Sequence, residues 1–200
     1  MISIYKLKPK FQQLLTPILF FLHRCKITAN QITITSVFLS VLIACLFWNA
    51  DNNNWLFLSL PIGLLLRMAL NALDGMLARN FDQMSTLGEV LNEIGDVISD
   101  VIIFFPLLKF QTESLYLIIV FIVLSVINEF SGVLGKSIGK ERRYDGPMGK
   151  SDRAMLLGVY GLIAFFGINI SQYSKYVFGT IILLLLLSTF IRLKKVLNGA

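Results

Sequence analysis

Residues 71–100 read NALDGMLARN FDQMSTLGEV LNEIGDVISD, and they place Asp74, Asp96 and Asp100 next to long apolar runs. A charged side chain in apolar surroundings costs several kcal/mol unless it is paired, bound to a metal or hydrated. We therefore expect these carboxylates to lie together in the interior of the protein and to form a functional site.

The same stretch predicts two polar stripes on consecutive helices. Arg67, Asn71 and Asp74 follow one another at three- and four-residue spacing, which puts them on one helix face. The second stripe has four-residue spacing and begins with a glycine that would allow close approach to the backbone: Gly88, Asn92, Asp96 and Asp100. The polar segment RNFDQMST between them reads as a turn, so the helices would be antiparallel neighbours. Two facing oxygen-rich stripes predict a site for Mg²⁺ or Mn²⁺.

The composition predicts an all-α membrane protein. Apolar residues make up 56% of the 200 residues and charged residues 15%, and long apolar segments recur along the chain, as in membrane-spanning bundles. We expect one membrane domain over residues 1–200, in which residues 27–200 form a six-helix transmembrane bundle. The expected spans are residues 31–49, 55–75, 86–108, 114–134, 153–171 and 174–192.

Residues 1–26 predict an amphipathic helix that lies at the membrane interface. Lys6, Lys8 and Lys10 precede the short apolar run LLTPILFFL, and the basic segment HRCK (23–26) closes it. This pattern suits a helix on an anionic leaflet. A cleaved signal peptide is the alternative, but no small-residue cleavage site follows the run. Thr28 and Asn30 are then N-cap candidates for the first span.

The distribution of basic residues predicts the orientation of the chain in the membrane. The N-terminus, the second and fourth loops and the C-terminus hold fifteen of the eighteen Lys and Arg residues. The positive-inside rule therefore puts both termini in the cytoplasm, with the site of Asp74 and Asp96 open to the cytoplasmic side of the cell inner membrane. The net charge of +6 is explained by this topology and by anionic lipid, and no nucleic-acid partner is expected.

Residues 71–96 resemble the signature of the CDP-alcohol phosphatidyltransferases, D-x-x-D-G-x-x-A-R-x8-G-x3-D-x3-D. The matching positions are Asp74, Gly75, Ala78, Arg79, Gly88 and Asp96. Asn71 and Asn92 stand where the family has its first and third aspartates. The segment before the first span is also similar to a T-P-N segment of the family, with Ala29 in place of proline. The signature is long and its spacing is strict, which makes the match specific.

The resemblance implies transfer of a phosphatidyl or related phospho-alcohol group from a CDP-alcohol, such as CDP-diacylglycerol, to an acceptor hydroxyl in phospholipid synthesis, with release of CMP. It implies Mg²⁺ or Mn²⁺ as cofactor and a homodimer. Asp74 would be the principal metal ligand, and Asp96 would be the general base and touch the metal as well. Asn71 and Asn92 would be neutral oxygen ligands or hydrogen-bond partners of the nucleotide ribose and phosphates. The CDP-alcohol would contact Gly75, Ala78, Arg79 and Gly88, with Arg79 on the diphosphate.

The two asparagines leave the activity open. In the family, the first and third aspartates touch both ions of a two-metal site, and asparagine offers a carbonyl oxygen without the charge. Weaker or single-metal binding follows. A pseudoenzyme that binds nucleotide or lipid is one alternative to an active transferase. A membrane transporter is another, because intramembrane carboxylates are typical of transport, but transport has no need of the strict signature spacing.

Further polar residues predict an acceptor pocket and an ion pair. Lys150 and Arg153 match the place where the family carries basic residues toward the acceptor. Glu129 either turns into the cavity and contacts the acceptor or Arg67, or reaches the interface. Both basic residues would favour an anionic acceptor such as a phosphorylated polyol, although simple loop charge is the alternative reading. Arg67 and Asp100 lie at similar depth and predict a structural ion pair, which competes with a metal-binding role for Asp100. We expect Arg142 and Arg143 at the surface.

Overall fold

The computed structural model describes residues 8–138, 140–168 and 170–198. Within these ranges every regular element is a helix, which confirms the all-α prediction. In chain order the elements are α1 (Lys8–Arg24), α2 (Ala29–Trp48), η2 (Asn54–Leu58), α3 (Ser59–Asn80), α4 (Thr86–Phe104), α5 (Leu107–Phe110), η3 (Thr112–Ser114), α6 (Leu115–Ser137), α7 (Lys150–Phe165), η4 (Ser171–Tyr173) and α8 (Ser174–Asn198).

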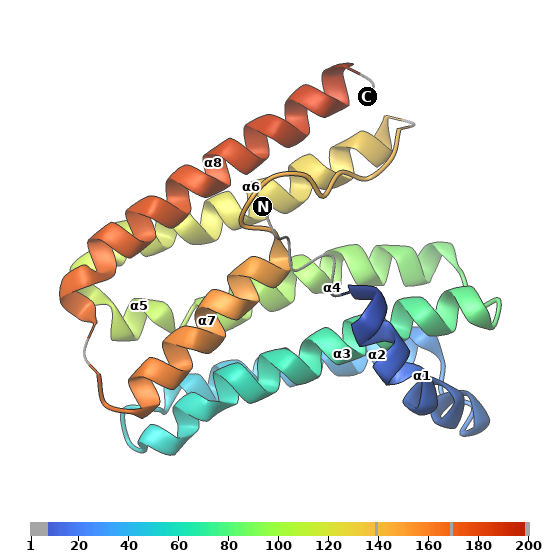
Figure 1. The fold of residues 1–200 in the computed structure, drawn as a ribbon, viewed down its shortest axis with the longest axis horizontal. Helices are drawn as coiled ribbons and strands as arrows, with labels where there is room; N and C mark the ends of the chain where they lie inside the picture. Colours follow the sequence, from blue (N-terminus) through green and yellow to red (C-terminus); the bar gives the residue numbers. More distant parts are fainter. Residues whose placement is uncertain (1–7, 139, 169, 199–200) are drawn as a thin grey trace.

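Among the described residues, four helical segments are long and apolar enough to cross a membrane: α2, η2 with α3, α6, and η4 with α8. Helix α4 differs because it carries four carboxylates, and α7 differs because it has only 16 residues. Both nevertheless lie in the same bundle as the other long helices (Figure 1). The six-span count and the cytoplasmic position of the termini therefore stay predictions.

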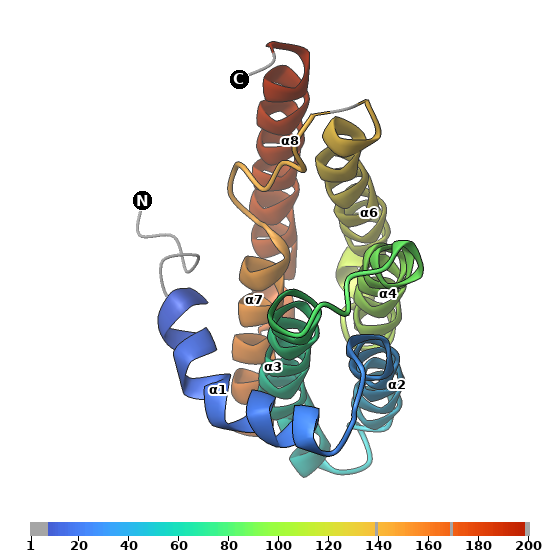
Figure 2. The same cartoon turned by 90° about the vertical axis from the view of Figure 1, so that its right-hand side faces the viewer.

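The bundle consists of two groups of helices. Helix α2 packs against both α3 and α4, and α3 packs against α7. Helices α6 and α8 pack mainly against each other, and Figure 2 shows them beside the first group. The stripe-bearing helices α3 and α4 run in opposite directions, as predicted. Helix α2 packs against both of them. Helices α3 and α4 meet through polar side chains, Arg67 with Asp100 and Asn71 with Asp96.

The helix ends follow from local capping. Thr28 Oγ1 accepts a hydrogen bond from the Gln31 N–H at 3.3 Å, and Gln31 Oε1 accepts from the Thr28 N–H at 2.9 Å. This capping box confirms Thr28 as the N-cap of α2. The next N–H, that of Ala29, donates to Gln83 Oε1 at 2.8 Å. A proline at this position would lack that donor.

The predicted fifth span, residues 153–171, is too long. Helix α7 ends at Phe165 because Gly167 adopts a φ of +71°, a conformation that glycine accepts without steric cost. The Gly167 N–H donates to the Ala164 carbonyl and the Ile168 N–H to the Ile163 carbonyl, which closes the helix with a Schellman motif.

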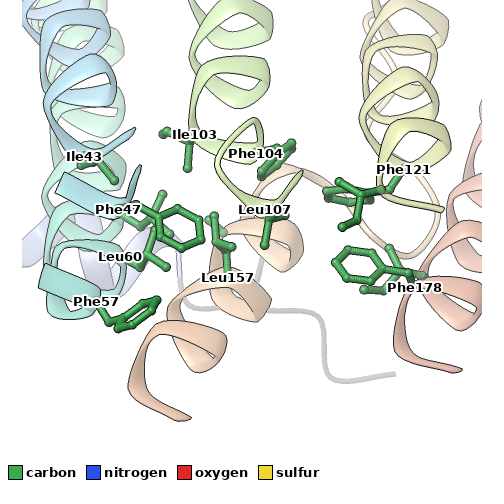
Figure 3. Close-up of a cluster of buried hydrophobic side chains, with 14 of the residues drawn as sticks. Ile43, Phe47, Phe57, Leu60, Ile103, Phe104, Leu107, Phe121, Leu157 and Phe178 are labelled. Atoms are coloured by element: carbon green, nitrogen blue, oxygen red, sulfur yellow. The ribbon is translucent and has the colours of Figure 1, made fainter. Parts of the chain in front are cut away.

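Apolar packing is concentrated at the end of the bundle that contains η2 and α5. Figure 3 shows the buried side chains there, which include Phe47 of α2, Leu60 of α3, Phe121 of α6 and Phe178 of α8. Every long helix except α1 contributes to this cluster. The polar residues of the predicted site consequently lie in the other half of the bundle.

Helix α1 crosses the ends of α2 and α3 instead of running along the bundle (Figures 1 and 2). Its buried residues Leu15 and Leu19 pack in a cluster with Leu73 and Leu77 of α3. Its other face exposes apolar side chains such as Leu14, an arrangement that suits a helix at the membrane interface. Residues 1–7 of the predicted interfacial segment lie outside the described residues.

Replacing Leu19 by Ala should loosen the docking of α1. Leu19 is 1% exposed, and truncation of a buried leucine costs about 2–5 kcal/mol. Thermal unfolding in detergent should show a clearly lower midpoint for Leu19→Ala than for wild type. Leu14→Ala on the exposed face of the same helix is the matched control, and equal midpoints for the two variants would contradict the docking.

Candidate active site

Helix α2 supplies the partners of the first stripe. Thr33 Oγ1 donates to Asp74 Oδ2 at 2.9 Å, and Ser36 Oγ donates to Asn71 Oδ1 at 2.7 Å. Sequence reasoning missed both hydroxyl groups. The signal was present, because the small residues Ala29, Thr33, Ser36 and Ser40 recur at four-, three- and four-residue spacing, a pattern typical of close helix contacts in membranes.

Asp96 of α4 is where the two stripes meet. Its Oδ1 atom accepts a hydrogen bond from Asn71 Nδ2 at 3.3 Å and forms an ion pair with the ammonium of Lys150. Arg67 Nη2 lies 4.0 Å from the same oxygen. The Asp96 side chain is 16% exposed, so it stays accessible. The structure thus brings Asn71, Asp96 and Lys150 together. Asn92, one turn before Asp96, is half-buried.

Deeper in the bundle, Asp100 joins two arginines. Arg67 Nη1 lies 2.8 Å from Asp100 Oδ1, the contact that the depth argument predicts. Arg153 Nη2 lies 2.7 Å from Asp100 Oδ2 and 2.9 Å from Glu129 Oε1. These ion pairs join α3, α4, α6 and α7. A structural role for Arg67 and Asp100 stays a prediction, which this geometry favours.

The buried position of Arg153 and Glu129 weakens their predicted contact with an acceptor. They are 2% and 6% exposed, and their charged groups face each other. Lys150, whose side chain is 25% exposed, is the basic residue of this segment that reaches Asp96. Acceptor binding by these three residues stays a prediction, and Lys150 is the best placed of them.

Arg142 corrects one expectation. It was expected at the surface, but it is half-buried, pairs with Glu93 and lies 3.3 Å from Glu129 Oε2. Burial of the Arg142 guanidinium works against its charge, but Tyr144, Glu93 and Glu129 favour the charge and raise the pKa of Arg142 above its ordinary value. Glu93 lies off the polar stripe of α4, and this position lets it reach the loop. Arg143, also expected at the surface, is half-buried as well.

The four residues predicted to contact a CDP-alcohol lie near the end of α3 and the start of α4. Arg79 is exposed, and its Nη1 atom lies 3.2 Å from where a Cβ on Gly75 would be. Asn30 Oδ1 lies 2.5 Å from the corresponding point on Gly88. Both glycines therefore make room for a polar side chain. Ala78 is half-buried one turn after Gly75.

Arg192 of α8 and Arg153 of α7 hold the loop before α7. Arg192 of α8 donates to the Asp145 carbonyl at 3.0 Å and to the Asn128 carbonyl at 2.6 Å. Met148 has a φ of +60°, which is unfavourable for methionine, and its carbonyl accepts from Arg153 at 3.1 Å. These contacts start α7 about halfway along the bundle (Figure 1), which puts Lys150 next to Asp96.

The site offers oxygen donors of the kind that hard divalent cations bind. Among the described residues, no group of three or more His, Cys, Asp and Glu side chains is arranged for metal binding. Asp74 and Asp96 offer two carboxylates, and Asn92 adds an amide oxygen on the same side of α4. Hard cations such as Mg²⁺ and Mn²⁺ prefer such oxygens. The carbonyl of Asn71 already accepts a hydrogen bond from Ser36.

Fold and site together define a helical membrane protein with an oxygen-rich site flanked by Lys150 and Arg79. A family model described as CDP-alcohol phosphatidyltransferase matches residues 26–191. The chain belongs to this family. The match covers α2, α3, α4, α6 and α7 in full and residues 174–191 of α8.

Known proteins support this assignment. The chain is 42% identical over 195 residues to the inner membrane protein YnbA of Escherichia coli strain K12, which covers 98% of this chain and 96% of YnbA. This relative and the apolar helices establish a membrane location. The fold resembles phosphatidylinositol phosphate synthase PgsA1 of Mycobacterium tuberculosis with CDP-DAG bound, with a TM-score of 0.76, 21% identity and coverage of 92% of this chain and 94% of that chain. The same enzyme with manganese and citrate gives a TM-score of 0.75 and 22% identity, with coverage of 90% and 88%.

Replacing Arg153 by Met should destabilise the bundle strongly. The change leaves Asp100 and Glu129 buried with fewer partners, and breaking a buried ion pair in this way costs about 3–5 kcal/mol. The free energy of unfolding in a mild detergent measures the loss. Lys195→Met breaks the more exposed pair with Asp145 and should cost no more than about 1 kcal/mol. Similar losses in both variants would contradict the structural role of Arg153.

Proposed function

We propose that this protein transfers a phosphatidyl or related phospho-alcohol group from a CDP-alcohol, such as CDP-diacylglycerol, to an acceptor hydroxyl and releases CMP. One observation carries the proposal: Asn71 of α3 donates a hydrogen bond to Asp96 of α4, and Lys150 forms an ion pair with the same carboxylate. Family membership supports the reaction class. The CDP-DAG bound to PgsA1 supports the choice of donor, and the manganese in the second PgsA1 structure supports a divalent cation.

In the proposed reaction the acceptor's hydroxyl oxygen attacks the phosphorus that carries the lipid. A new phosphorus–oxygen bond forms, and the bond from that phosphorus to the bridging oxygen of the diphosphate breaks. CMP leaves with the electron pair of the broken bond. The hydroxyl proton passes to Asp96 as general base. Within the described residues the Asp96 side-chain contacts involve Oδ1, which leaves Oδ2 to receive the proton.

The other side chains position the two substrates. Arg79, exposed at the end of α3, suits the diphosphate because its planar guanidinium can donate two parallel hydrogen bonds. Lys150 beside Asp96 suits an anionic acceptor such as a phosphorylated polyol. A bound Mg²⁺ or Mn²⁺ ion, held by Asp74 next to Asp96, would neutralise charge on the diphosphate and on the leaving CMP.

We also propose on which side of the membrane the site lies and how the protein assembles. The site lies in the half of the bundle that contains the basic loops, so we place it on the cytoplasmic side of the inner membrane, where nucleotides are found. We also propose a homodimer, on the family resemblance. A pseudoenzyme is the alternative that the two asparagines raise, and the assay below distinguishes it.

Purified protein in nanodiscs should release CMP from CDP-diacylglycerol when Mg²⁺ or Mn²⁺ and a suitable hydroxyl acceptor are present. A panel of neutral and phosphorylated polyols tests the acceptor class. Asp74→Asn and Asp96→Asn should each lower the rate by about 100-fold or more. Asp82→Asn is the matched control, because Asp82 is exposed in the turn after α3 and its φ of +52° suits asparagine.

Failure of every acceptor and metal, while CDP-diacylglycerol still raises the unfolding temperature, would favour the pseudoenzyme. If Asp74→Asn and Asp96→Asn both release CMP at the wild-type rate, the assignment of the site is overturned.

Replacing Arg79 by Gln should raise the KM for the CDP-alcohol about tenfold or more, because hydrogen bonds to charged groups contribute about 1.5–3 kcal/mol. Steady-state CMP release at varied CDP-diacylglycerol measures the effect. Arg24→Gln at the exposed end of α1 is the control. An unchanged KM in Arg79→Gln would remove Arg79 from the diphosphate site.

A further inference from the structure

Lys150 is the cation closest to the carboxylate of the proposed base. We propose that its ammonium group supplies fixed positive charge at Asp96, so that the site binds a single divalent cation, held by Asp74. The inference rests on the proposed function for the nature of the substrate, a diphosphate. It concerns how this chain balances charge in a site with only two signature carboxylates.

The contacts of Asp96 show why a second cation is disfavoured. The Lys150 ammonium and the Asn71 amide nitrogen both lie on Oδ1, and an Arg67 nitrogen is 4.0 Å from the same atom. An ammonium and a divalent cation on one oxygen repel each other, and burial strengthens that repulsion. Lys150 and a metal ion therefore exclude each other at Oδ1.

Asn71 acts as a donor at this point. A carboxylate accepts hydrogen bonds and donates none, so the side of the Asn71 amide that faces Asp96 must be its NH₂ group. The carbonyl side faces Ser36, whose hydroxyl donates to it at 2.7 Å. Asn71 thus reinforces the positive environment of Asp96 and is turned away from the role of metal ligand.

The position of Lys150 is fixed by its helix. It is the first residue of α7, and Arg153, three residues later, is anchored to Asp100 and Glu129. Residues three apart share a helix face. The anchored arginine therefore holds the start of α7 in place, and the lysine points toward Asp96 from a rigid base.

Charge balance supports a single ion. The ion pairs of the deeper network match three arginines, Arg67, Arg142 and Arg153, to three carboxylates, Glu93, Asp100 and Glu129. The three side chains of the site itself, Asp74, Asp96 and Lys150, carry one net negative charge. One divalent cation converts this to one positive charge, which complements a diphosphate. A second would leave three positive charges.

The test is a titration of the purified protein with Mn²⁺ alone, in which electron paramagnetic resonance measures the free ion. Wild type should bind about one Mn²⁺ per chain. Lys150→Gln should raise Mn²⁺ affinity about tenfold or more, because it removes a like charge from the site. The double variant Lys150→Gln with Asn71→Asp should bind a second Mn²⁺. Lys150→Arg keeps the charge and should behave as wild type.

Controls use the ion pair at the opposite end of the bundle. Lys109→Gln breaks the pair with Asp51, and Asn52→Asp adds a carboxylate next to Asp51. Neither change should alter Mn²⁺ binding. Thermal unfolding of each variant verifies that it is folded. Wild type that binds two Mn²⁺ or none would overturn the inference, and so would a Lys150→Gln variant whose affinity is unchanged or lower.

CMP release from the same preparations separates this inference from the proposed function. Tighter Mn²⁺ binding in Lys150→Gln, with no CMP release by wild type, supports the role of Lys150 and defeats the transferase proposal. If wild type releases CMP but Lys150→Gln binds Mn²⁺ as wild type does, the transferase proposal is supported and the role of Lys150 is defeated.

Discussion

The Arg153 guanidinium, buried between Asp100 and Glu129, is the interaction on which the rest of this structure depends. It connects α7 with α4 and α6 through two ion pairs. Buried charges persist only where each has a partner, and here Arg67 and Arg142 complete the pairing. The apolar cluster at the other end of the bundle packs the helices, while these ion pairs fix their relative depth.

The depth at which α7 begins determines which side chain lies next to Asp96. Because Arg153 lies in the first turn of α7, its anchoring determines where the helix begins, and the loop bound by Arg192 adjusts to this start. Lys150 then lies at Asp96. The proposed site is therefore the outer edge of a structural charge network. Deep members of the network pair with one another, and the outer members retain the exposure that a substrate needs.

Much of the site could be predicted from sequence because helical spacing alone groups its residues. Periodicity predicts the two stripes and the depth match of Arg67 with Asp100. Residue type predicts Thr28 as a capping residue. Arg142 could not be placed in this way, since its partners Glu93 and Glu129 come from two other helices and the loop path decides the contact. Thr33 and Ser36 lie on a small-residue face of α2 that the sequence shows, but their partners Asp74 and Asn71 follow only from the packing of that face against α3. The early end of α7 depends on the conformation of Gly167, which a hydropathy pattern does not register.

Centrally, we propose that the site holds one divalent cation at Asp74 while Lys150 neutralises Asp96. Crystals of the protein grown with Mn²⁺ and CDP-diacylglycerol would test it most directly through an anomalous difference map at the manganese absorption edge. The account predicts one peak beside Asp74, with the Lys150 nitrogen still on Asp96. Two peaks, or one peak on Asp96 Oδ1 with Lys150 displaced, would contradict it.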